Sequence, residues 1–199
     1  MAVELPKISV AEILAHKIAA LKPGVLPTAT MRKCEDLLID VVGLCVTARN
    51  EDYVKSALAG CDDDGSCTVI GHGRMLTAGG AAFVNGTAAH GEDFDDTFEG
   101  GPVHAGAVIV PAVLAACERH KRDAKAALIG IAVGCEVMCR LSTVVPKAVH
   151  KAGFHPTAMP RSAAHPSGLC RSQAASTAGT ITAPACTGPP SKVSSKSSP

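Results

Sequence analysis

Two alanine-rich apolar segments, residues 77–90 and 105–120, constrain most strongly what this chain can fold into. Both are built mainly from alanine, glycine and valine, and aromatic residues make up only 3% of the chain, with no tryptophan. Side chains this small fill a core only when the elements that carry them approach closely. Helices of alanine do so readily, whereas β-sandwiches favour aromatic and β-branched residues. The sequence therefore predicts an all-α, helical bundle-like domain.

Apolar residues recur at helical spacing in five segments, which predicts helices near 10–21, 30–46, 77–90, 105–120 and 124–141. Thr28 or Thr30 is expected to cap the second helix, and Thr77 the third. Pro111 should kink the fourth helix or mark a restart, because proline has no backbone N–H to donate. The segment 50–71 is less regular, with 67–70 as a short extended piece.

The stretch 85–106 separates the two alanine-rich segments and gathers an unusual number of ionisable and hydroxyl side chains: His90, Glu92, Asp93, Asp95, Asp96, Thr97, Glu99 and His104. One interpretation is a solvated acidic loop. Two phenylalanines interleaved with the acids indicate that parts of the loop pack, and its glycines allow close backbone approach. Acids and histidines between two buried elements favour proton-transfer chemistry.

Four ordered blocks carry a resemblance to a known family. They read NGTAAHGEDFDDT, HAGAVIVPAVLAACE, GCEVMCR and GFHPTA, and together they extend over roughly residues 10–158. The chain resembles the MmgE/PrpD family, which includes 2-methylcitrate dehydratases and cis-aconitate decarboxylases. The resemblance implies a lyase that dehydrates or decarboxylates a small di- or tricarboxylate by acid/base catalysis, without metal or cofactor, and that forms a homodimer in its full-length form.

The resemblance also implies roles for four residues. Asp93 and Thr97 match the acid and the hydroxyl of DFDDT, His104 matches the histidine after that loop, and His155 matches the one in GFHPT. His104 is the expected main acid/base, with Asp93 orienting it or shuttling a proton. Thr97 would bind substrate, and His155 would donate a second proton or hold a carboxylate. The neighbouring acids Asp95 and Asp96 are expected to cap a helix or face solvent, and His90 to be a structural helix histidine.

Composition argues against several other classes of protein. The net charge of +1 does not suit a nucleic-acid-binding surface. No apolar run is expected to span a membrane, and the N-terminus lacks a secretory h-region, which favours a cytoplasmic location. The nine cysteines lack zinc-type spacing and are expected to be reduced and to pack as small apolar side chains. An iron–sulfur site, used by other enzymes acting on tricarboxylates, is the alternative.

The chain changes character after residue 158. The last 41 residues contain no acid and are rich in serine, alanine and proline, so they bury too little apolar surface to offset the entropy of ordering. We therefore predict a helical domain over 1–158 and a disordered tail over 159–199, possibly the product of a frameshift. A chain truncated there would lack downstream parts of the family's site and be weakly active, or be a non-catalytic helical fragment.

Overall fold

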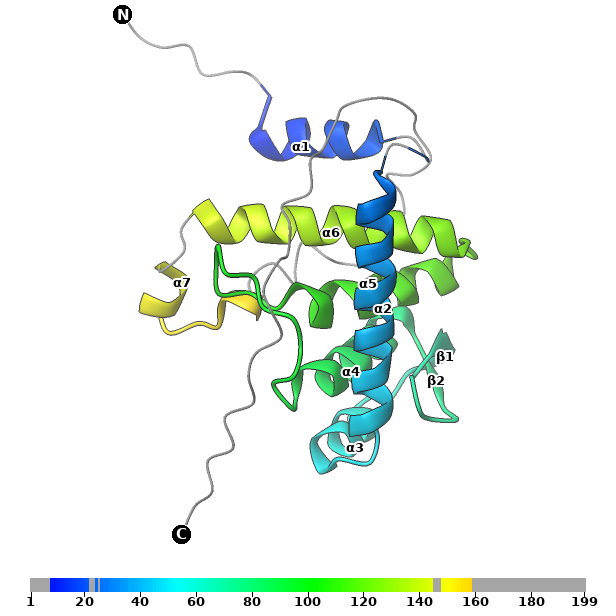
Figure 1. The fold of residues 1–199 in the computed structure, drawn as a ribbon. Helices are drawn as coiled ribbons and strands as arrows, with labels where there is room; N and C mark the ends of the chain where they lie inside the picture. The colour runs from blue at the N-terminus through cyan, green and yellow to red at the C-terminus, as the bar shows by residue number, and fades with distance from the viewer. Residues whose placement is uncertain (1–7, 22–23, 25, 145–147, 159–199) are drawn as a thin grey trace, which may run out of the picture.

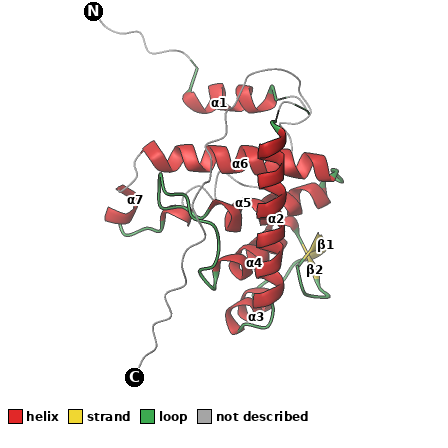
Figure 2. Cartoon of the chain, in the orientation of Figure 1, coloured by secondary structure: helices red, strands yellow, loops and turns green. Residues whose placement is uncertain are grey.

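The structure is a computed structural model that describes residues 8–21, 24, 26–144 and 148–158. The described helices are α1 (Val10–Ala19), α2 (Thr28–Ala48), α3 (Asp52–Ala59), α4 (Ala78–His90), α5 (Ala105–Arg119), α6 (Ala124–Val144), the single turn α7 (Ala148–Lys151) and a 3₁₀ turn (Pro156–Ala158). The strands β1 (Asp64–Thr68) and β2 (Met75–Leu76) form one small antiparallel hairpin (Figures 1 and 2). The predicted all-α class is confirmed, whereas the predicted tail over 159–199 lies outside the described residues.

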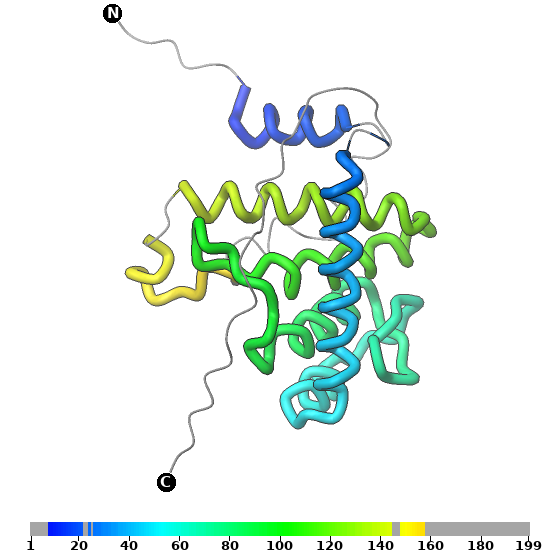
Figure 3. Tube along the Cα trace, in the orientation of Figure 1, coloured from blue at the N-terminus to red at the C-terminus, as the bar shows by residue number. Residues whose placement is uncertain are grey.

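Helix α5 is the centre of the core. It packs against α4 on one side and α6 on the other, and α2 crosses all three helices (Figures 1 and 3). Eleven of its fifteen residues are buried, most of them alanine or valine. The small side chains let the helix bury nearly its whole circumference, as the composition predicts.

The contact between α5 and α6 depends on two glycines one turn apart on α6. A Cβ at Gly134 would lie 2.5 Å from Cγ2 of Ile109, and a Cβ at Gly130 would lie 3.0 Å from Cγ1 of Val113. Ile109 and Val113 are themselves buried one turn apart on α5. The two helices therefore meet where α6 has no side chain to keep them apart.

Pro111 does not divide α5, which runs continuously from Ala105 to Arg119. The carbonyl that proline leaves without its helical donor, four residues earlier, belongs to Ala107. The oxygen of Ala107 lies against α4, 3.2 Å from the position of a Cβ at Gly86. The glycine that costs α4 some helical stability therefore makes room for this carbonyl.

The ends of the predicted helices are only partly right. Thr77 caps α4, with its hydroxyl accepting from the backbone N–H of Gly80 at 3.3 Å. The expected cap of α2 is wrong, because the helix begins at Thr28 and is preceded by Pro27 without a side-chain hydrogen bond. Helix α1 begins with an unpredicted capping box, and its apolar stripe is not buried among the described residues.

Two buried thiols pack as the composition predicts. Cys45 of α2 donates from Sγ to the carbonyl oxygen of Asn85 in α4 at 3.2 Å, and Cys67 of β1 donates to that of Ala115 in α5 at 3.4 Å. Burial raises the pKa of the Cys45 thiol to about 12, so it stays protonated at neutral pH. These two thiols join elements of the core.

Helix α6 corrects one expectation. It is 21 residues long with a mean hydropathy of 1.6, which is long and apolar enough to cross a membrane by length and composition. Half of the most apolar 18-residue stretch of α6 is buried inside the fold. The core helices of water-soluble proteins meet the same criteria of length and composition.

Candidate active site

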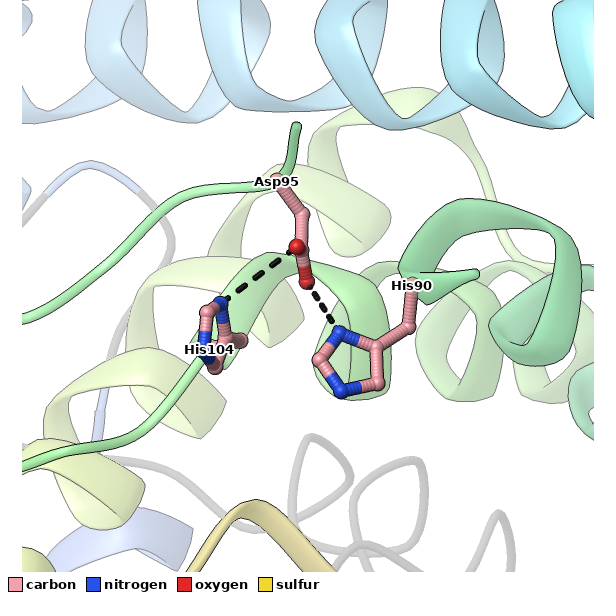
Figure 4. A group of neighbouring side chains, drawn as sticks. All are labelled: His90, Asp95 and His104. Atoms are coloured by element: carbon pink, nitrogen blue, oxygen red, sulfur yellow. Dashed lines mark hydrogen bonds and ion pairs between the residues drawn. The ribbon is translucent and has the colours of Figure 1, made fainter. Parts of the chain in front are cut away.

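A buried carboxylate lies between two histidines where α4 ends and α5 begins. His90 is the last residue of α4, His104 directly precedes α5, and Asp95 lies in the loop between them. His90 Nδ1 lies 2.7 Å from Asp95 Oδ2, and His104 Nδ1 lies 3.4 Å from Asp95 Oδ1 (Figure 4). The side chain of Asp95 is fully buried, whereas those of His90 and His104 are 36% and 21% exposed. The two imidazoles therefore reach solvent while the carboxylate that joins them does not.

The backbone around His104 is held by two side chains from other segments. The N–H of His104 donates to Oγ1 of Thr157 at 3.1 Å, across 53 residues of sequence. The N–H of Gly106 donates to Oδ1 of Asp96 at 2.7 Å, which caps the start of α5. A Cβ at Gly106 would lie 2.4 Å from that oxygen, so only glycine allows the approach.

His155 brings a third imidazole to the same place. Its ring centroid lies 5.7 Å from that of His90 and 6.0 Å from that of His104, and the two latter rings are 4.9 Å apart. His150 of α7 follows at 6.1 Å from His155. Burial, and then the charges of His90, His104 and His150, lower the pKa of His155 below its ordinary value. The structure thus places the two histidines chosen from sequence in one cluster, together with a third that was not.

Asp95 is placed differently from what the sequence predicts, and His90 lies beside it in the cluster. Asp95 was expected to cap a helix or face solvent, yet it is the buried partner of both imidazoles. His90 was expected to be a structural helix histidine, and its contact with Asp95 at 2.7 Å is compatible with that role as well as with a place in the cluster. The capping role fits Asp96 alone. The spacing of His90 and Asp95, five residues apart across a helix end, was the available signal.

Asp93 and Thr97 lie on the same loop but are exposed. Neither side chain makes a hydrogen bond with another residue in the described part of the chain. Asp93 does act on the cluster electrostatically, because its charge raises the pKa of His155 against the larger lowering effects. The orienting role of Asp93 and the substrate contact of Thr97 stay predictions.

An acidic cavity lies behind this cluster, between α2 and α6. It has a volume of about 500 Å³, and its lining includes Asp36, Asp40, Asp96, Glu136 and Lys33, but none of the histidines. Burial, together with the charge of Asp95, raises the pKa of Asp40, and burial is also the main cause that raises the pKa of Asp96. A cavity of this sign does not suit a carboxylate anion, so we place the candidate chemistry on the histidine side.

The histidine cluster can move protons between neighbouring imidazoles and a bound anion. Histidine exchanges protons near neutral pH, and a carboxylate hydrogen-bonded to one ring nitrogen fixes which nitrogen is available. Each of the three residues His90, Asp95 and His104 offers one possible metal-ligand atom, and these atoms lie within 4.8 Å of one another. This spacing could also hold a metal ion. Acid/base chemistry and metal binding are thus both open to this set of side chains by geometry.

Comparison with known proteins identifies the family. The family model of the MmgE/PrpD N-terminal domain matches residues 12–190, a range that extends beyond Ala158. A cis-aconitate decarboxylase-like protein of Aspergillus oryzae, oryM, is 26% identical over 150 residues, covering 70% of this chain and 31% of that protein. A cis-aconitate decarboxylase of Aspergillus terreus is 28% identical over 116 residues, covering 56% of this chain and 24% of that protein.

The aligned part of this chain therefore spans less than a third of the length of either relative. Both alignments are to proteins named for the same reaction type, and the family model covers most of the described helices. The chain belongs to the MmgE/PrpD family, as an N-terminal domain of that type.

Proposed function

We propose that this domain supplies the histidine part of a lyase site that acts on a small di- or tricarboxylate, such as cis-aconitate or 2-methylcitrate. The observation that carries the proposal is the convergence of His90, His104 and His155 around the buried carboxylate of Asp95. Solvated loops have no physical reason to bring a histidine from 50 residues away. Membership of the MmgE/PrpD family and the names of the two relatives support the same substrate class.

The chemistry follows from what such a substrate demands. Dehydration beside a carboxylate, or loss of CO₂ from an unsaturated acid, needs a proton donor or acceptor at the reacting carbon or leaving hydroxyl. His104 is the proposed acid/base, because it is partly exposed and its backbone is fixed from two sides. His155 would exchange the second proton or hold a carboxylate, with Asp93 and Thr97 at the solvent-facing edge. The mechanism requires no metal or redox cofactor.

Binding tests the proposal on the 199-residue chain. We expect cis-aconitate or 2-methylcitrate to shift the imidazole NMR signals of His104 and His155, and the neutral analogue of either acid, its trimethyl ester, to leave them in place. His16 in α1 is a control within the same spectrum, because it is exposed on a helix away from the site. Shifts of equal size at His16, or no shifts with either acid, would contradict the proposal.

Turnover tests the roles of the residues. A chimera would join this domain to the downstream part of the Aspergillus oryzae relative. There, His104→Ala should lower loss of cis-aconitate by about a hundredfold or more, as expected for removal of a general acid/base. His16→Ala is the matched control and should not change the rate. The domain alone should convert substrate too slowly for the His104→Ala effect to be measured, and a chimera that tolerates His104→Ala would refute the assigned role.

A further inference from the structure

We propose that Asp95 is the positioning residue of this site: its two oxygens accept from Nδ1–H of His90 and of His104 and so leave Nε2 of both rings available for proton exchange. What the Nε2 atoms do with substrate rests on the proposed function. The assignment of the tautomers rests on the geometry around Asp95 and on which groups can donate or accept, without any substrate. It gives the orienting role to Asp95 rather than to Asp93, two residues earlier.

Both imidazoles present the same nitrogen to the carboxylate. His90 Nδ1 is at hydrogen-bonding distance from Oδ2, 2.7 Å, and His104 Nδ1 is 3.4 Å from Oδ1. Figure 4 shows Asp95 reaching between the two rings, with the other nitrogen of each ring directed away from it. One carboxylate thus faces two rings, with one oxygen for each.

The longer contact is the informative one. Asp95 Oδ1 and His104 Nδ1 are both buried, and neither has a hydrogen-bond partner elsewhere among the described residues. Buried polar atoms without partners are costly, and these two face each other. A hydrogen bond between them would pair both atoms.

The chemistry of the groups decides which way the hydrogens point. An ionised carboxylate only accepts hydrogen bonds, whereas each nitrogen of a neutral imidazole is either a donor or an acceptor. Where one carboxylate accepts from two Nδ1 atoms, as proposed for Asp95, both of those atoms must therefore carry hydrogen. That leaves a lone pair on Nε2 of each ring, on the side away from Asp95.

Asp93 provides the contrast. It belongs to the same acidic run, yet its side chain is exposed and makes no hydrogen bond among the described residues, although its charge acts on His155. Changing Asp93 to asparagine therefore removes a similar charge from the same loop without touching a hydrogen bond to His90 or His104. The two substitutions separate positioning from general electrostatics.

Long-range ¹H–¹⁵N NMR of the histidine side chains reads the tautomers directly in the 199-residue chain. Spectra would be recorded at about pH 8.5, well above the ordinary imidazole pKa of about 6.5, and assigned with His90→Gln and His104→Gln. We expect the Nδ1–H tautomer as the main form of both rings. A main form with Nε2–H at either ring would overturn the proposal without any variant of Asp95.

Asp95→Asn sharpens the test, because asparagine offers one acceptor and one donor where aspartate offers two acceptors. One of the two histidines must then accept from the amide and switch to the Nε2–H tautomer. Asp93→Asn should leave both tautomers unchanged. Unchanged tautomers in Asp95→Asn, with wild-type circular dichroism, would overturn the proposal, as would a switch in Asp93→Asn. If the Asp95→Asn chain does not fold, the wild-type spectrum still decides.

The outcome is separable from that of the proposed function, because no substrate is present in the measurement. A chain with the expected tautomers that neither binds nor converts a carboxylate refutes the proposed function alone. A chain that binds carboxylates at His104 but shows the Nε2–H tautomer refutes the role of Asp95 alone.

Discussion

His155 shows what crowding several imidazoles does to a single residue. Partial burial disfavours its charged form, and protonation of His90, His104 and His150 adds repulsion. We expect its pKa, followed by the Cε1–H signal in an NMR titration, to lie below 6.5. Because the pKa of His155 is lower in the folded chain than in the unfolded one, the unfolded chain binds more protons at pH values between these two pKa values. The contribution of His155 to stability is therefore lost as pH falls below 6.5.

Neighbouring charges can be removed one at a time to check the cause. His90→Gln should raise the pKa of His155 part of the way toward 6.5, because burial, the largest cause, remains. A pKa of His155 at or above 6.5 in the wild-type chain would contradict the prediction.

The residues of the site could be predicted in part. His104 and His155 were found from their motifs, because a family pattern fixes positions without reference to geometry. Asp95 was not predicted to belong to the site. Four of the five residues at positions 92–96 are acidic, and only the path of the backbone decides which of them faces inward. Asp93 has a φ of 55°, in the left-handed region that aspartate tolerates, so the loop does not follow a regular alternation there. The spacing of residues along the sequence therefore does not predict which side chains face inward beyond this turn.

At the scale of elements, long periodic segments were predicted well and short ones were not. The five expected helices all exist, with ends shifted by a few residues. Helix α3 and strand β2 were not assigned, and the extended piece expected at 67–70 overlaps only the end of β1, because elements of this length depend on the core that they cover more than on their own sequence. Val54 of α3 and Cys67 of β1 are buried against that core. In the loop, Phe98 packs partly against the core as expected, whereas Phe94 is 69% exposed.

The close approach of α5 to α6 predicts the effect of adding one methyl group to α6, at Gly134. In Gly134→Ala the new Cβ would lie 2.5 Å from Cγ2 of Ile109, which is buried and has little space to move. Overpacking of this kind costs about 1–3 kcal/mol, and the better helix propensity of alanine returns about 1 kcal/mol. We expect a net loss of up to about 2 kcal/mol in the free energy of unfolding, measured with urea.

Gly43 of α2 is the matched control, because it also lies inside a helix but a Cβ there would meet nothing within 4 Å. Gly43→Ala should stabilise the chain by about 0.5–1 kcal/mol through helix propensity alone. Stabilisation by both substitutions would show that α5 and α6 are not in close contact.

At the scale of the whole molecule, one hydrogen bond joins the end of the described chain to the start of α5. Thr157→Val removes the hydroxyl that accepts from the N–H of His104 but keeps the shape of the side chain. We expect faster hydrogen exchange at the His104 amide, with amides in the middle of α5 unchanged. Thr47→Val is the control, because the Thr47 hydroxyl is exposed and bonds within its own helix. Equal exchange at His104 in wild type and Thr157→Val would contradict the role of this bond.

The same hydrogen bond can form only late in synthesis, because its two residues lie 53 positions apart in the chain. The helices α2, α4 and α5 that form most of the core have all left the ribosome long before Thr157, and domains tend to fold from the N-terminus as they emerge. Thr157, which accepts from the N–H of His104, is synthesised 53 residues after His104. His155 is synthesised only two residues before Thr157. During synthesis the residues of most of the core therefore precede the third histidine of the cluster.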